Sequence, residues 1–260
     1  MFLNEPTTTA YDLHFRIAGV PVCVHPFFWL AGLVMSASGG RDVTGVLIWI
    51  GVLFVSILIH ELGHAFAMLR FGEVPRVVLY MMGGLAISDG GGYQRGGRSK
   101  ARKPFEQIVI SAAGPAAGFL FAALIVAAVN VSGGKVGFHR IDIRESMQFW
   151  SVDGIRNRNM LVLIHDLLFV NIGWGLVNLL PVYPLDGGQI ARQLFTVQDP
   201  WDGVRKSLWL STVVAGAFAA IGVMYWQSIF VGILFGSLAA DNYMSIQQIG
   251  GGGGRGGRPW

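Results

Sequence analysis

The stretch that decides the fold covers residues 51–64, Gly51-Val52-Leu53-Phe54-Val55-Ser56-Ile57-Leu58-Ile59-His60-Glu61-Leu62-Gly63-His64. It lies inside an apolar run from about 43 to 69. At about 1.5 Å per residue, a helix of this length exceeds the roughly 30 Å hydrocarbon core of a bilayer. The run therefore predicts a transmembrane helix that carries three ionisable side chains in its last third.

The pattern His60-Glu61-Leu62-Gly63-His64 is the H-E-x-x-H arrangement of metal sites. Histidines four residues apart share one helical face, so both rings can bind one ion. Glu61 is rotated about 100° from His60, where it can act as a general base without being a ligand. The pattern also occurs by chance, but ionisable groups at membrane depth cost about 2–3 kcal/mol each, which favours a metal site. Zinc suits this site because it lowers the pKa of a bound water to about 7.

Composition supports the membrane assignment. Charged residues make up 13% of the 260 residues, against about 25% in soluble domains, and the apolar set makes up 53%. The net charge of +4 lies in the gaps between apolar runs, which indicates a membrane protein and no nucleic-acid partner. The single cysteine, Cys23, excludes an intrachain disulfide.

Further apolar runs predict an all-α polytopic membrane protein with about six transmembrane helices. The first run is short for a span, and the runs cover about 26–38, 43–69, 105–131, 160–181, 207–225 and 227–246. We expect a short strand and turn over 15–25, a small membrane-associated hairpin over 74–88, and a loop over 182–206. One transmembrane domain is expected over 1–249, followed by a flexible Gly- and Arg-rich tail over 250–260.

The distribution of basic residues predicts the orientation. With six spans, thirteen of the 19 Lys and Arg residues fall on the side that holds both termini, and six fall on the other side. The richer side is expected to be cytoplasmic, as in a multi-pass protein of the cell membrane.

A third metal ligand is expected from Asp186. The fourth run ends in Asn178-Leu179-Leu180-Pro181-Val182-Tyr183-Pro184-Leu185-Asp186-Gly187-Gly188 and travels toward the same side as the second run. Both motifs therefore arrive at similar depth. The prolines end the helix, and the glycines allow close backbone approach. In isolation such a Pro/Asp/Gly segment is usually an ordinary turn.

The chain resembles the site-2 protease family of intramembrane zinc metalloproteases. The resemblance covers roughly residues 15–190 and rests on the H-E-x-x-H motif, the 178–187 segment, Gly83-Gly84, and Ala113-Gly114-Pro115. It implies one zinc ion per chain, and regulated hydrolysis of single-pass transmembrane substrates in the bilayer. The implied zinc ligands are His60, His64 and Asp186, with Glu61 as catalytic base and Asn178 as a polar group near the substrate or the oxyanion. Gly118 departs from the family's frequent Asn, and no PDZ or CBS-type domain is recognised.

A transmembrane substrate must unwind before its carbonyls can be attacked, because helical hydrogen bonds occupy them. An edge strand within 74–88 can supply replacement partners, with Gly83 and Gly84 permitting close backbone approach. A plain membrane-surface hairpin is the alternative for this segment. Similarly, His165-Asp166 is either functional or, as we favour, a structural pair near the opposite membrane face.

Two other functions remain open. A metal-ion transporter would need polar residues through the whole bundle, and the last two runs carry almost none before Asp241. A catalytically inactive homologue that binds membrane partners is disfavoured by the intact Glu61. The sequence does not predict an oligomeric state.

Overall fold

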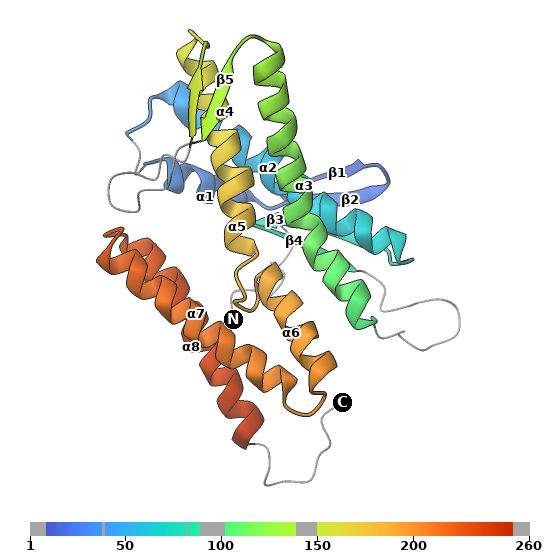
Figure 1. Ribbon diagram of the computed structural model, residues 1–260. Coiled ribbons are helices and arrows are strands. Elements are labelled where there is room, and N and C mark those ends of the chain that lie inside the picture. The colour runs from blue at the N-terminus through green and yellow to red at the C-terminus, as the bar shows by residue number, and fades with distance from the viewer. Residues whose placement is uncertain (1–8, 38–39, 82, 89–101, 139–149, 252–260) are drawn as a thin grey trace. The chain divides into compact units, whose positions relative to one another are not determined.

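The computed structural model describes residues 9–37, 40–81, 83–88, 102–138 and 150–251. Its helices are mostly long and apolar, and its strands are short (Figure 1). The helices are α1 (Pro26–Ala37), α2 (Val43–Arg70), α3 (Pro104–Val131), α4 (Arg158–Leu168), the π-helix η1 (Phe169–Trp174), α5 (Gly175–Asn178), α6 (Asp186–Gln198), α7 (Gly203–Met224) and α8 (Ile229–Gly251). The strands are β1 (Leu13–Ile17), β2 (Val20–Val24), β3 (Pro75–Tyr80), β4 (Gly83–Ser88), β5 (Lys135–Phe138) and β6 (Trp150–Asp153).

Among the described residues, five helical segments are long and apolar enough to cross a membrane. They are Val43–Arg70, Pro104–Val131, Arg158–Asn178, Gly203–Met224 and Ile229–Ile249, which match five of the six expected runs. The remaining run forms α1, whose 12 residues extend only about 18 Å. The polytopic helical fold with a small sheet is confirmed. The count of six spans, and the orientation that depends on it, stay predictions.

The chain divides into two compact units. The first contains the chain to Arg102 with 113–141 and 148–176, and the second contains 103–112 and the chain from Val177 onward. The single domain expected over 1–249 stays a prediction. Residues 252–260 of the expected tail lie outside the described residues.

The sheet of the first unit has the order β1-β2-β3-β4. β1 and β2 form an antiparallel hairpin, β2 and β3 are parallel, and β3 and β4 are antiparallel. Alternation along β2 buries Val20, Val22 and Val24 against residues of α2, as expected for a sheet with one covered face. Both hairpins confirm the strands expected over 15–25 and 74–88, and β4 lies at an edge of the sheet beside α2 (Figure 1).

Three elements were not expected. The β5–β6 hairpin forms a second small sheet in the first unit, and η1 interrupts the fourth apolar run. The prediction of a loop over 182–206 is wrong, because the helix α6 occupies Asp186–Gln198. This helix is amphipathic and has only 13 residues, so its sequence contains no apolar run long enough to predict a membrane span. It packs against α7, which lies alongside α8 (Figure 1).

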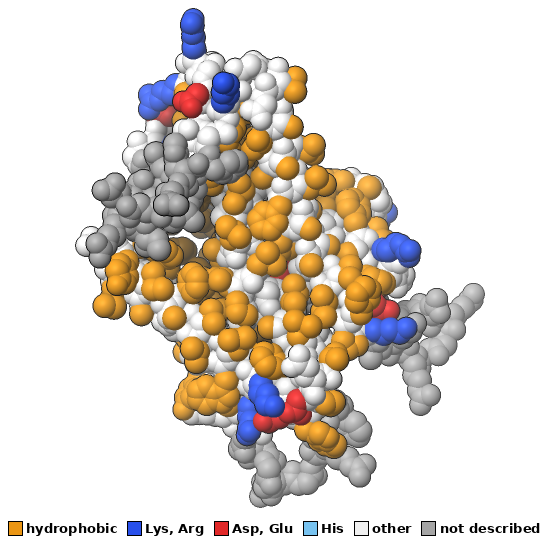
Figure 2. Space-filling model, viewed as in Figure 1, with side chains coloured by type: hydrophobic (Ala, Val, Ile, Leu, Met, Phe, Trp, Pro, Cys, Tyr) orange, Lys and Arg blue, Asp and Glu red, His pale blue; other side chains and the backbone are white. Residues whose placement is uncertain are grey.

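Two buried polar side chains within the apolar helices of the first unit, Asp166 and Asn171, make side-chain hydrogen bonds to other segments of the chain. Asp166, which is buried, accepts two hydrogen bonds from the Arg41 guanidinium at 2.6 and 2.9 Å. Asn171 donates to the Ser56 hydroxyl at 2.8 Å. Both findings support the structural interpretation of these residues. The outer surfaces are apolar, and Figure 2 shows charged side chains only in small groups on the visible face.

Candidate metal centre

The two histidines of the motif lie on the buried side of α2. Asp42 caps the start of this helix by accepting a hydrogen bond from the Gly45 amide at 2.8 Å. His60 and His64 follow one turn apart, and their Nε2 atoms are 3.2 Å apart. Nitrogen donors on one tetrahedral zinc ion lie roughly 3.3 Å apart, given Zn–N bonds of about 2.0–2.1 Å. The pair as it stands therefore fits a zinc ion.

Gly114 makes room for the two imidazoles. A Cβ added at this position of α3 would lie 2.5 Å from Cε1 of His64 and 2.8 Å from Nε2 of His60. Both distances are far below an ordinary contact, so only glycine allows the helix to lie against the histidine pair. Gly114 was named from the sequence only as part of the family resemblance, without a role of its own. Its position within Ala113-Gly114-Pro115 was the available signal for a role at the metal site.

Gly84 performs the same function for Glu61. A Cβ added to this residue of β4 would lie 2.6 Å from Cδ and 2.7 Å from Oε1 of Glu61. The Glu61 side chain is buried, so its carboxylate is held between α2 and the edge strand. The preceding Gly83 has a φ of +126°, a conformation that side chains rarely adopt, and its Cβ position faces Trp174. The Gly-Gly pair thus shapes the turn into β4 and seats the expected base.

Asp186 belongs to the second unit, where it is buried in the first turn of α6. The two glycines that follow it pack this turn onto the preceding segment. A Cβ on Gly187 would lie 2.5 Å from the Leu180 carbonyl oxygen, and one on Gly188 would lie 2.5 Å from that of Val182. Close backbone approach, expected from the sequence, is therefore what positions Asp186 within its unit.

The expected residues are divided between the units. His60, Glu61, His64, Gly83 and Gly84 are brought together within the first unit. Asn178, the last residue of α5, is buried and belongs to the second unit with Asp186. Ligation by Asp186 and substrate contact by Asn178, Gly83 and Gly84 stay predictions.

An ion pair lies just beyond the end of α2. Arg102 donates to both carboxylate oxygens of Glu73 at 2.6 Å each. Burial raises the pKa of Glu73, but hydrogen bonds from Arg102 and Ser88 outweigh that effect and leave the pKa below its ordinary value of 4.5. Because Ser88 ends β4, this carboxylate joins the end of α2 to the edge strand.

The comparison with known proteins agrees with this geometry. The model of peptidase family M50 matches residues 48–220, which is more than half of the chain. The chain belongs to peptidase family M50. The site-2 protease family expected from the motifs is therefore confirmed, and with its apolar helices the chain is an integral membrane protein.

Two curated M50 relatives extend the match. A zinc metalloprotease of Methanocaldococcus jannaschii is 24% identical over 245 residues, covering 90% of this chain and 62% of the relative. The putative zinc metalloprotease Rip3 of Mycobacterium tuberculosis is 31% identical over 194 residues, covering 68% of this chain and 42% of the relative. The chain thus spans about two-fifths to three-fifths of the length of these relatives.

A solved structure shares the fold of this M50 chain. The site-2 protease from Methanocaldococcus jannaschii is 19% identical and superposes with a TM-score of 0.53, covering 96% of this chain and 98% of the other. At this identity the similarity establishes the fold alone.

Proposed function

We propose that the chain is a zinc metalloendopeptidase that hydrolyses peptide bonds of single-pass membrane proteins within the bilayer. One zinc ion per chain is held by His60, His64 and Asp186. The observation that carries the proposal is the arrangement in the first unit, where a zinc-spaced histidine pair adjoins a carboxylate on the same helix. Family membership and the names of the relatives support it.

The chemistry divides between the ion and the protein. When bound, zinc supplies a Lewis acid that lowers the pKa of a water molecule and polarises the scissile carbonyl. Glu61 accepts the proton of that water and then delivers it to the departing amine. Gly84 keeps this carboxylate within a buried site, where its position is fixed before the substrate arrives.

Substrate capture is assigned to β4, which lies at an edge of the sheet among the described strands. β4 ends the strand order, so its outward backbone groups can pair with an unwound segment of a transmembrane substrate. Because Gly84 of this strand adjoins Glu61, a segment paired with β4 lies beside the general base. Asn178 is proposed as an additional polar contact for the substrate.

The test is cleavage in liposomes that contain the full chain and candidate single-span substrates. Glu61→Gln should retain its zinc, because Glu61 is not a ligand, and should lose about 10²- to 10⁴-fold in rate. Gly51→Ala is the matched control on the same helix, since its added Cβ meets nothing within 4 Å. Rapid cleavage by Glu61→Gln would remove the proposed base. Zinc flux into the liposomes without cleavage would instead favour the transporter.

The protein is proposed to lie in the cell membrane with both termini in the cytoplasm. This orientation rests on thirteen basic residues on one side of a six-span arrangement against six on the other. Reporter domains fused to either end should both be cytoplasmic. Opposite locations for the two reporters would indicate an odd number of spans.

A further inference from the structure

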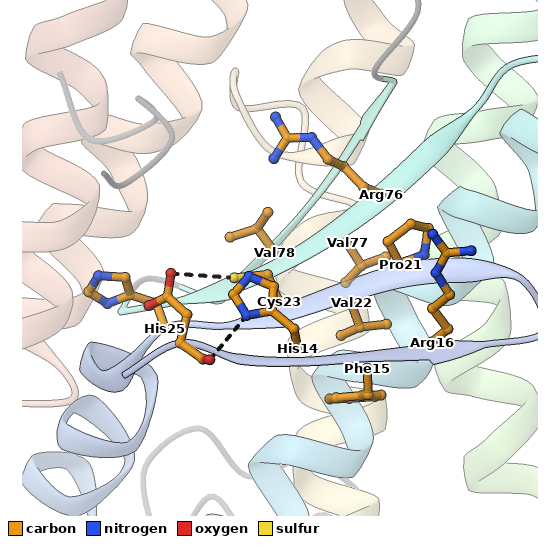
Figure 3. Close-up of a pocket in the computed structure, with 11 residues that line it drawn as sticks. His14, Phe15, Arg16, Pro21, Val22, Cys23, His25, Arg76, Val77 and Val78 are labelled. Atoms are coloured by element: carbon orange, nitrogen blue, oxygen red, sulfur yellow. Dashed lines mark hydrogen bonds between the residues drawn. The ribbon is translucent and has the colours of Figure 1, made fainter. Parts of the chain in front are cut away.

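The β1–β2 hairpin carries a cluster of metal-binding side chains on the face of the sheet that is turned away from the core. His14 and Cys23 are directly opposite each other in the register of the two strands. Figure 3 shows their side chains next to one another, while Phe15 projects to the other face. Asp12 immediately precedes β1 and completes the cluster.

The donor atoms of the three side chains are close together. One ligand atom from each of Asp12, His14 and Cys23 lies within 4.8 Å of the others. The Sγ atom of Cys23 is 3.7 Å from Oδ2 of Asp12, close to the roughly 3.5 Å between donors of a tetrahedral zinc site. Small side-chain rotations would therefore bring all three donors onto one ion.

Neighbouring groups hold two of the donors in place. Thr9 donates to Asp12 from its amide at 3.0 Å and from its hydroxyl at 2.6 Å, and these hydrogen bonds hold the pKa of Asp12 below its ordinary value of 3.8. Nδ1 of His14 lies 3.1 Å from the carbonyl oxygen of Asp12. When this nitrogen carries the proton, the other ring nitrogen is left as the donor. A backbone carbonyl in this position is the usual orienting partner of a metal-binding histidine.

The set of one carboxylate, one imidazole and one thiol defines the class of ion. Mixed oxygen, nitrogen and sulfur donors suit a borderline-soft divalent ion such as zinc, and are a poor match for calcium or magnesium. Arg16 and Arg76 line the same pocket of about 410 Å³. Their positive charges oppose the approach of a cation, so the three donors must outweigh that repulsion.

We propose that Asp12, His14 and Cys23 form a second metal site, separate from the H-E-x-x-H centre, that binds one zinc-type divalent ion. Its donors come from the segment before β1, from β1 and from β2. A bound ion therefore crosslinks the start of the described chain to the sheet that carries β4. None of these three residues belongs to the H-E-x-x-H centre, so the site does not depend on the proposed peptidase function.

The sequence provides a specific spectroscopic test. Cys23 is the only cysteine, so any thiolate-to-metal charge-transfer band in the full chain must come from it. Titration of the detergent-solubilised chain with Cd²⁺ should produce such a band that saturates at one ion per chain. Cys23→Ser should abolish the band, whereas removal of zinc from the H-E-x-x-H centre should leave it unchanged.

Two further variants distinguish a three-ligand metal site from binding by the Cys23 thiolate alone. His14→Ala and Asp12→Asn should each raise the Cd²⁺ dissociation constant about tenfold or more, because each removes a ligand. Asp202→Asn, which removes a partly exposed carboxylate in the second unit, is the matched control and should leave the constant unchanged. A far-UV circular dichroism spectrum equal to that of the intact chain verifies that each variant is folded. The proposal would be overturned if no saturable band appeared. It would also be overturned if His14→Ala and Asp12→Asn both bound Cd²⁺ as tightly as the intact chain does.

Discussion

Gly84→Ala tests whether the edge strand positions Glu61, the proposed catalytic base. The added Cβ would lie 2.6 Å from Cδ of Glu61, and an ordinary contact begins at 3.4 Å. The carboxylate must therefore move by roughly 0.8 Å or more. Because Cδ lies near the end of a flexible side chain, the fold can absorb this movement, but the catalytic geometry cannot. A displacement of about 1 Å in an active site can reduce the rate about 10²-fold.

The assay compares zinc content and liposomal cleavage for the intact chain, Gly84→Ala and Gly51→Ala. Gly84→Ala should keep the zinc content of the intact chain, because its Cβ contacts the proposed base and not the histidines, and should lose about 10²-fold in kcat. Gly51→Ala adds the same methyl group in open space and should match the intact chain. Normal cleavage by Gly84→Ala would refute the argument that this contact holds Glu61. Loss of zinc would show that the strand supports the ligands instead.

Three other substitutions test further contacts within the first unit. Gly114→Ala should lose the zinc of the H-E-x-x-H centre and lose cleavage, as measured by metal analysis and the liposome assay, because its Cβ would occupy the space of both imidazoles. Gly63→Ala would place a Cβ 2.5 Å from the Ala113 carbonyl oxygen, so denaturation in detergent should show a loss of about 1–3 kcal/mol. Glu73→Gln should lower Tm at pH 7, and the difference should disappear as the pH falls from 4.5 through the lowered pKa, because protonation of Glu73 breaks the same ion pair. A Tm difference between the two proteins that increased as the pH fell would contradict this expected pH dependence.

Much of the architecture could be predicted because its causes are local. Apolar runs that match the bilayer thickness identified α2, α3, α7 and α8, and the β-branched segment with Gly83-Gly84 identified the β3–β4 hairpin. The helix α6 was missed because it is amphipathic and short, which gives no membrane signal. The parallel pairing of β2 with β3 joins strands separated by two helices, and such register is not written in either strand alone.

The sequence by itself identified the residues of the candidate metal centre. Two histidines at helical spacing must share a face, and ionisable groups inside an apolar helix require a function that offsets their cost. Only the tertiary structure decided which glycines hold that chemistry in place. Gly84 adjoins Glu61 and Gly114 adjoins the histidines because strands and helices far apart in the chain pack without a side chain between them. Glycine has no side chain, so it adds neither hydrophobic periodicity nor charge to the sequence pattern. Its role becomes visible only when the structure shows which neighbouring side chain occupies the space beside it.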